Sequence, residues 1–162
     1  HGLFTPRPVK RKHEIASVNR RARPVAAPRR PTLHARTASL HLEVLYHLGD
    51  RSIEHAVIPW CARRGLAVVG YSPFGSGHFS GPRTASGRVL IDVARRRSAT
   101  PRQVALAFLT HRRGLFATPK ASSVAHALEN AAAGKLRLAP GDVRLIDAAF
   151  PVPPPRRGVS ML

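Results

Sequence analysis

The stretch LAVVGYSPFGSG, residues 66–77, decides the fold class of this chain. Its first six residues are continuously apolar instead of alternating with polar ones, which is typical of a strand covered on both faces, as in parallel sheets. A loop with glycines at positions 75 and 77 is expected to follow. The stretch therefore predicts a buried parallel strand that ends in a glycine-flanked loop.

Strand and helix signals alternate on both sides of this stretch, which predicts an α/β fold. Upstream, a short β-prone run over residues 43–46 stops at a Gly-Asp pair, and Ser52 can cap a helix that ends at Gly65. Trp60 is expected on the apolar face of that helix. Pro59 is expected to bend the helix or to delay its regular part.

The clearest local signal downstream is TPRQ, residues 100–103. Thr100 is a suitable helix N-cap, proline follows at the first helical position, and Gln103 closes a capping box. A third strand is expected over residues 115–118, and three strands cannot close a barrel alone. The remaining helices are expected after Gly87, over residues 124–133, and after Pro140, the last with Leu145 on its apolar face.

Positive charge is the most prominent feature of the composition, with 27 Lys and Arg against eight Asp and Glu and a formal net charge of +19. Residues 1–43 hold ten of the basic residues and two of the acidic ones. Such a charge fits a nucleic-acid or acidic-surface partner. An excess of Arg, Ala and Pro with only four Lys also fits a coding bias, so both explanations stay open.

Residues 1–41 contain five prolines, several basic clusters and no sustained helical or strand period, so we expect a disordered basic segment. Its clusters fit either a localisation or phosphate-binding patch or a solvated tail. Cys61 is the only cysteine, which excludes an intramolecular disulfide and a cysteine-based zinc site. No apolar run suits a transmembrane helix or a secretory signal, so a cytoplasmic location is expected.

Five blocks of the sequence resemble the aldo-keto reductase family in their order and spacing. They are VLYHL at residues 44–48, IPWC at 58–61, GYSP at 70–73, TPRQVAL at 100–106 and TPKASS at 118–123, the last followed by Glu129-Asn130. The resemblance covers residues 44–155. It implies that residues 42–150 form a partial (β/α)₈ TIM barrel, strands six to eight with their helices, between the basic segment 1–41 and a Pro-rich tail, 151–162.

The resemblance also implies an NADP(H)-dependent oxidoreductase that reduces a small-molecule carbonyl by hydride transfer. A complete barrel needs about 250 residues, whereas this chain has 162 and starts with His1, so we expect a fragment. The family's catalytic Asp, Tyr, Lys and His lie upstream of the matched region, and residues 1–41 contain no Tyr. We therefore expect the cofactor-binding half only, inactive alone, with an open sheet prone to self-association. The alternative is a basic nucleic-acid-binding or interaction protein that uses a half-barrel scaffold.

The loop after the strand at residues 66–71 is where the resemblance places the nicotinamide and the pyrophosphate of the cofactor. Tyr71 takes the position that stacks on the nicotinamide ring. Glycines in such a loop also let backbone N–H groups approach a phosphate, whatever the family. Glu43 stands where the family has a Gln, and its carboxylate can accept from the nicotinamide amide but cannot donate to it. The residues placed at the pyrophosphate are Ser72, Pro73, Phe74 and Ser76.

A second group of candidates surrounds the helix start expected near residue 124. Orphan N–H donors, the helix dipole and the Lys120 charge would converge on an anion there. In the family this block, here Lys120, Ala121 and Ser122, binds the adenosine 2′-phosphate. His126 stands where many relatives carry Arg, which weakens the expected preference for NADP over NAD. The positions that contact the adenine edge are Glu129 and Asn130.

Overall fold

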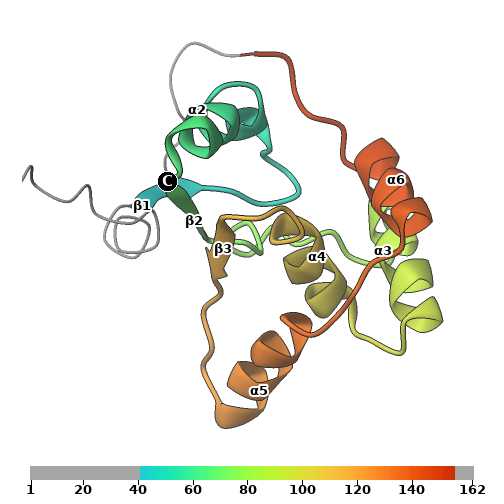
Figure 1. Cartoon of the computed structure of the whole chain (residues 1–162). Coiled ribbons are helices and arrows are strands. Elements are labelled where there is room, and N and C mark those ends of the chain that lie inside the picture. Colours follow the sequence, from blue (N-terminus) through green and yellow to red (C-terminus); the bar gives the residue numbers. More distant parts are fainter. Residues whose placement is uncertain (1–40, 156–162) are drawn as a thin grey trace, which may run out of the picture. The chain divides into compact units, whose positions relative to one another are not determined.

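Three parallel strands form the sheet within residues 41–155, the part of the chain that the computed structural model describes (Figure 1). They are β1 (His41–Leu45), β2 (Ala67–Tyr71) and β3 (Leu115–Thr118), in the spatial order β1-β2-β3. The described residues all fall within one compact unit, Pro31–Leu162. The predicted α/β class with a parallel sheet is confirmed, and its strands all end at the same edge.

The central strand, β2, is the apolar stretch with which the sequence analysis began. Val68 and Gly70, on one face, are buried, and a Cβ atom at Gly70 would lie 3.0 Å from the Cβ atom of Tyr46. On the other face, Val69 is half-buried and its register partner in β3, Phe116, is 57% exposed. The second face of the sheet is therefore more open than the continuous apolar run predicted.

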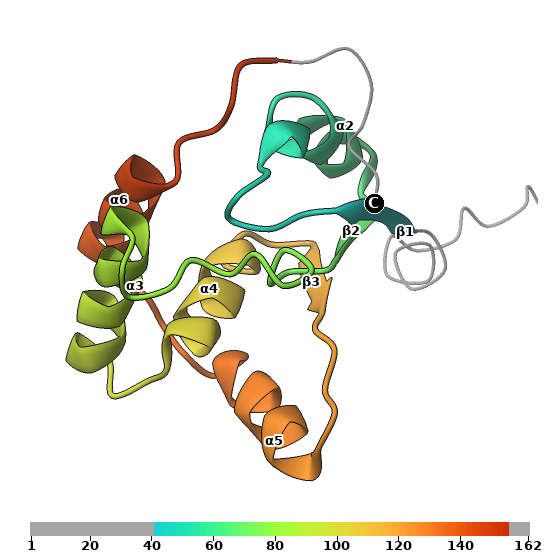
Figure 2. The same cartoon turned by 180° about the vertical axis from the view of Figure 1, so that it is seen from behind.

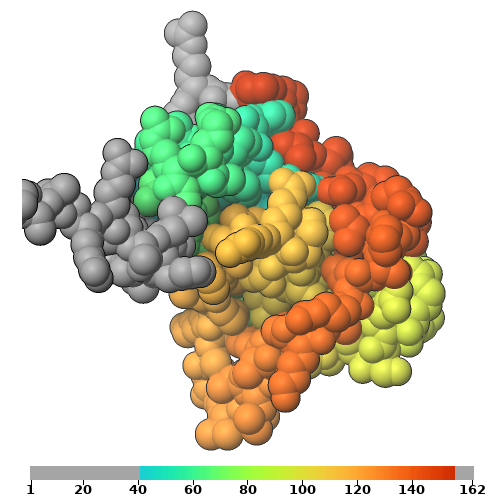
Figure 3. Space-filling model, in the orientation of Figure 1, coloured from blue at the N-terminus to red at the C-terminus, as the bar shows by residue number. Residues whose placement is uncertain are grey.

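Helices pack around the sheet, and α4 lies between the sheet and the pair α3–α6 in both views (Figures 1 and 2). Residues 104–109 of α4 are all buried, because α3, α5 and β3 contact the helix. By contrast, α5 is a surface helix, which projects in orange at the lower edge of Figure 3. The helical segments are the 3₁₀ turn η1 (Ser52–Glu54) and the α-helices α2 (Val57–Arg64), α3 (Ala85–Arg96), α4 (Pro101–Leu109), α5 (Val124–Ala133) and α6 (Pro140–Ala149).

The capping box predicted at the start of α4 is confirmed. The Thr100 hydroxyl accepts from the backbone N–H of Gln103 at 3.2 Å, and the Gln103 side chain accepts from the backbone N–H of Thr100 at 3.0 Å. The same two side chains reach α5, where Thr100 donates to the Glu129 carboxylate at 2.6 Å and Gln103 donates to the Glu129 carbonyl at 3.0 Å. The cap therefore also ties the start of α4 to α5.

The predicted start of the first helix, with Ser52 as its cap, is wrong. A 3₁₀ turn comes first, without a side-chain cap, and α2 begins only at Val57. Ser52 does not cap a helix; its backbone N–H donates to the Asp50 carboxylate at 3.0 Å. Pro59 is the third residue of α2, where its missing N–H leaves no intrahelical bond unmade. The expected delay of the regular helix is thus confirmed.

Two residues predicted to lie on buried apolar helix faces, Trp60 and Leu145, are exposed to solvent. Trp60 is 42% exposed, and the Arg64 guanidinium lies over its ring, 4.1 Å from the centroid. Because α2 starts late, Ile58 and Cys61 take the buried side instead. In α6, Leu145 is exposed while its neighbour Ile146 is fully buried. Both errors arise because the residue facing the core depends on the packing partner, which a short apolar pattern does not fix.

The start of α3 also differs from the expectation. The helix begins at Ala85, and Gly87 lies inside its first turn, with its backbone N–H donating to the N-cap hydroxyl of Thr84 at 3.0 Å. A Cβ atom at Gly87 would lie 1.9 Å from the carbonyl oxygen of Gly81. The glycine is therefore needed for a close approach between the helix and the preceding loop, and it does not end that loop.

Arg51 is a buried charged residue that joins the loop after β1 to the end of α6. Its guanidinium donates to both carboxylate oxygens of Glu54 at 2.6 and 3.0 Å, to Asp147 at 2.6 Å and to the Phe150 carbonyl at 2.6 Å. Glu54 also accepts from the Tyr46 hydroxyl at 2.8 Å. Burial alone would raise the pKa of Glu54, but the hydrogen bonds from Arg51 and Tyr46 outweigh it and lower that pKa.

The predicted basic segment, residues 1–41, lies outside the described residues except for His41, the first residue of β1. Of the predicted Pro-rich tail, residues 151–155 are described and form neither helix nor strand. Between residues 41 and 155 there is no helix long and apolar enough to cross a membrane.

Candidate functional site

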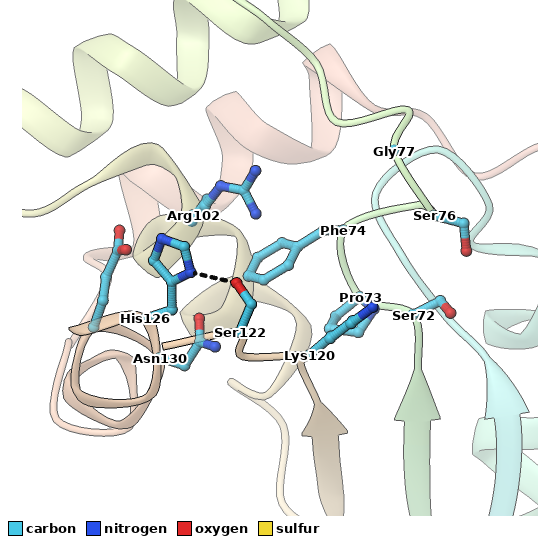
Figure 4. Close-up of a pocket in the computed structure, with 11 residues that line it drawn as sticks. Ser72, Pro73, Phe74, Ser76, Gly77, Arg102, Lys120, Ser122, His126 and Asn130 are labelled. Atoms are coloured by element: carbon cyan, nitrogen blue, oxygen red, sulfur yellow. Dashed lines mark hydrogen bonds between the residues drawn. The ribbon is translucent and has the colours of Figure 1, made fainter. Parts of the chain in front are cut away.

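A pocket of about 680 Å³ lies beyond the carboxyl ends of β2 and β3 (Figure 4). Three segments surround it: the loop after β2, the start of α4, and the segment from the end of β3 into α5. In α/β proteins this edge of a parallel sheet is where ligands generally bind. The residues lining it are Ser72, Pro73, Phe74, Ser76, Gly77, Arg102, Lys120, Ser122, His126, Glu129 and Asn130.

The loop after β2 has an unusual backbone. Ser72, Gly75, Ser76 and Gly77 all have positive φ angles, of 51°, 69°, 50° and 97°. For the two serines this conformation is costly, and such strain clusters at functional sites. The Gly75 N–H donates to the Ser72 carbonyl at 2.8 Å, which closes the first turn. Successive backbone N–H groups in a turn can form an anion-binding concavity, so the backbone suits a phosphate.

The start of α5 lines the opposite side of the pocket. Ser123 is its N-cap, and the hydroxyl accepts from the backbone N–H of His126 at 3.2 Å. The Ser122 hydroxyl lies 3.2 Å from Nδ1 of His126, the contact drawn dashed in Figure 4. Lys120 is exposed just before this helix. A lysine charge, the Ser122 hydroxyl and the positive end of a helix dipole thus gather at one side of the pocket.

Arg102 enters the pocket from the second position of α4. Its guanidinium carbon lies 4.8 Å from the Phe74 ring centroid and 5.4 Å from that of Phe79. The two rings pack edge to face, with centroids 5.7 Å apart. The guanidinium therefore rests on an aromatic platform that belongs to the loop after β2.

Among the pocket-lining residues, Glu129 is the one acidic side chain. Its carboxylate already accepts the Thr100 hydroxyl at 2.6 Å. Within residues 41–155, neither Lys120 nor Arg102 forms an ion pair with an acidic side chain. The pocket therefore carries an unbalanced positive charge, which favours an anionic ligand.

The structure brings together most of the residues that the sequence analysis selected. Nine of the eleven line the pocket, whereas Tyr71 and Ala121 do not. Tyr71 is the half-buried last residue of β2, and Ala121 is exposed between two lining residues. The pocket residues that sequence reasoning missed are Gly77 and Arg102. For Arg102 a signal existed, because a cation is disfavoured in the first turn of a helix unless something else requires it.

His47 and Tyr46 lie near the end of β1 and have structural partners. The His47 ring accepts from the Gly49 N–H at 3.1 Å, and burial lowers the pKa of this histidine, assisted by His78 and opposed by Asp50. Tyr46 is buried, and burial together with the Glu54 carboxylate raises the pKa of its phenol. Among the described residues, no three His, Cys, Asp or Glu side chains are placed to hold a metal ion.

Fold and pocket together define a class: an α/β protein with a cationic pocket at the carboxyl edge of a parallel sheet. The model of the Aldo/keto reductase family matches residues 20–150, and the chain belongs to this family. The match begins earlier than the sequence motifs indicated, and residues 20–40 lie outside the described part of the chain.

Individual relatives agree with this assignment. The chain is 32% identical to methylglyoxal reductase YeaE of Escherichia coli (strain K12) over 120 aligned residues, and the alignment covers 74% of this chain and 42% of that protein. It is 40% identical to pyridoxine 4-dehydrogenase of the same strain over 94 aligned residues, and that alignment covers 57% of this chain and 31% of that protein. A solved aldo-keto reductase from Klebsiella pneumoniae, in complex with NADPH, is 32% identical with a TM-score of 0.67, over 76% of this chain and 43% of that one.

Two consequences follow from these comparisons. The chain spans less than half the length of these relatives. The relatives are reductases and dehydrogenases, so the comparisons support an oxidoreductase and give no support to the nucleic-acid alternative.

Proposed function

We propose that this chain is the NADP(H)-binding part of an aldo-keto reductase, corresponding to strands six to eight of a (β/α)₈ barrel. The observation that carries the proposal is the pocket beyond β2 and β3, because residues from three separate segments meet there around an unbalanced positive charge. The solved relative from Klebsiella pneumoniae holds NADPH, which supports the same cofactor here.

The residues of the pocket fit a phosphorylated dinucleotide. The strained turns at Ser72 and Ser76 suit the pyrophosphate, since backbone N–H groups can approach it there. Lys120 and Ser122, at the start of α5, suit the phosphate on the adenosine ribose. Asn130 can donate to and accept from a base edge. When bound, the nicotinamide ring of this cofactor supplies a hydride for reduction of a small-molecule carbonyl.

We further propose that the chain alone does not reduce carbonyls. Reduction needs a positioned proton donor, and the family uses a tyrosine for it. Of the chain's two tyrosines, Tyr46 is buried, and its hydroxyl donates to Glu54 at 2.8 Å. Its raised pKa makes the phenol a poorer acid. Tyr71 ends β2, where the resemblance gives it the stacking position against nicotinamide.

A titration of the full chain with NADPH, followed by the fluorescence of the nicotinamide, tests the binding proposal. Lys120→Met should weaken binding about tenfold, because it removes one charge-assisted contact. Lys135→Met is the matched control, since Lys135 is also an exposed lysine but does not line the pocket. Absence of binding, or equal weakening by both changes, would contradict the proposal. Oxidation of NADPH by a reactive aldehyde would contradict the proposed inactivity.

Self-association is a further part of the proposal. The exposed Phe116 and half-buried Val69 leave an apolar face of the sheet open, and Leu42 is exposed at the β1 edge. Such faces and edges pair readily with a second copy. Sedimentation analysis should show oligomers that dissociate when Phe116 is replaced by Lys. A wild-type chain that stays monomeric at high concentration would contradict this part.

A further inference from the structure

Arg102 occupies a position that helix energetics alone would not select for a cation. It is the second residue of α4, and no acidic residue accompanies it in the first turn of that helix. The positive end of the helix dipole disfavours a cation there. No described acidic side chain pairs with it, so no ion pair within residues 41–155 offsets this cost.

The surroundings of Arg102 nevertheless hold its guanidinium in place. The rings of Phe74 and Phe79 lie beneath it, with centroids 4.8 and 5.4 Å from its central carbon. A guanidinium stacked on aromatic rings keeps its N–H donors free at its edges and loses less rotamer freedom when it binds a ligand. A held cation with free donors at the wall of a pocket is the arrangement expected for binding an anion.

Two hydrogen bonds place Arg102 relative to α5. Its helix begins beside Glu129, because Thr100 donates to the carboxylate and Gln103 to the carbonyl of that residue. Glu129 lies one helical turn after His126. Figure 4 shows Arg102 entering the pocket from α4 and His126 entering it from α5. Arg102 therefore lies between the loop after β2, on whose rings it rests, and the α5 side of the pocket, where the ribose phosphate is proposed to bind.

We propose that Arg102 is a specificity-determining residue of this pocket, which binds the 2′-phosphate of the adenosine ribose and supplies the guanidinium charge that His126 does not. This inference rests on the proposed binding of NADP(H). In Rossmann-type dinucleotide sites an acidic residue binds the free 2′-hydroxyl of NAD, whereas an arginine accommodates the 2′-phosphate of NADP. Here the pocket's acidic residue, Glu129, is already bonded to Thr100, while Arg102 has free donors.

Calorimetric titration of the full chain with two adenine nucleotides tests the inference. Adenosine 2′,5′-bisphosphate and adenosine 5′-monophosphate differ only in the 2′-phosphate, so their Kd ratio reports recognition of that group. Arg102→Met keeps a long apolar side chain over the rings and removes the charge. It should weaken binding of the bisphosphate about tenfold or more and leave the monophosphate unchanged. Arg102→Lys, which keeps the charge without the planar fork, should lie between wild type and Met.

Arg64→Met is the matched control, because Arg64 is also an exposed helical arginine stacked on an aromatic ring, but outside the pocket. It should change neither Kd. In the double variant R102M/H126R, a guanidinium on α5 should restore much of the Kd ratio, which a purely structural role of Arg102 would not allow.

Four results would overturn the inference. If Arg102→Met weakens both nucleotides equally, the residue shapes the pocket without reading the 2′-phosphate. If neither Kd changes, Arg102 has no part in recognition of either nucleotide. Equal wild-type affinity for both nucleotides refutes 2′-phosphate recognition while leaving a nucleotide site in place. If the wild-type chain binds neither nucleotide nor NADPH, the proposed function fails as well.

Discussion

Replacing Arg51 with Met removes a guanidinium that is 2% exposed and donates four hydrogen bonds of 2.6–3.0 Å. The largest loss falls on Glu54, whose side chain is 6% exposed and would keep only Tyr46 and the more distant Arg112 as partners. Asp147 is 44% exposed and can turn to water. Removing one partner of a buried ion pair typically costs about 3–5 kcal/mol, and we expect a loss in this range.

Urea denaturation followed by circular dichroism measures this loss, with Arg112→Met as the control. Arg112 contacts the same carboxylate at 3.4 Å, but its side chain is 45% exposed, so its loss should cost less than about 1 kcal/mol. Because a domain of this kind has about 5–15 kcal/mol of stability in total, Arg51→Met should shift the midpoint strongly or prevent folding. Arg51→Lys, which keeps a charge, should fall between the two. Arg51→Met within about 1 kcal/mol of Arg112→Met would refute the reasoning.

Three further predictions follow from particular contacts. His126→Arg should tighten NADPH binding about tenfold and leave NADH binding unchanged, because it adds a permanent charge beside the proposed ribose phosphate. Equal effects on both cofactors in a fluorescence titration would contradict this prediction. Gly87→Ala should lower the free energy of unfolding by about 1–3 kcal/mol, because the alanine Cβ atom would lie 1.9 Å from the Gly81 carbonyl oxygen. An unchanged urea midpoint would exclude that clash. Burial alone would raise the pKa values of Glu54 and Asp142, but hydrogen bonds, from Arg51 and Arg97 among others, outweigh it and lower them. The two carboxylates should therefore stabilise the fold fully above the unfolded pKa near about 4, and this stabilisation should be lost as the pH falls through the folded pKa values. A urea midpoint that is flat from neutral to strongly acidic pH would contradict this expectation.

The parts of the fold that the sequence predicted well are those set by local chemistry. The capping box at Thr100 specifies a helix start through two neighbouring hydrogen bonds, and the structure has both. The apolar run at residues 66–71 is long enough to identify the central strand. The orientation of Trp60 and Leu145 was wrong, because it depends on which element packs against each helix. No local pattern carries that information.

In the candidate site, too, local motifs predicted some residues correctly, while a residue whose role depends on tertiary packing was missed. Family motifs placed nine of eleven selected residues around one pocket, although the motifs lie far apart in the sequence. Arg102 was missed because its neighbours in the capping motif explain the helix start without it. Its value to the pocket depends on Phe74 and Phe79, more than twenty residues upstream, and only the folded chain brings those rings beneath the guanidinium. Glu129 was selected for adenine, yet its carboxylate also links α4 to α5 through Thr100.

Hydrogen–deuterium exchange of the full chain, with and without NADPH, tests most directly whether the pocket beyond β2 and β3 binds the cofactor. Slowed exchange is expected in two separate segments, residues 72–77 and residues 120–130, since both line the pocket. Residues 57–64 of α2 contribute nothing to the pocket and should exchange at an unchanged rate. No protection in either segment at saturating NADPH, or protection confined to α2, would contradict the account.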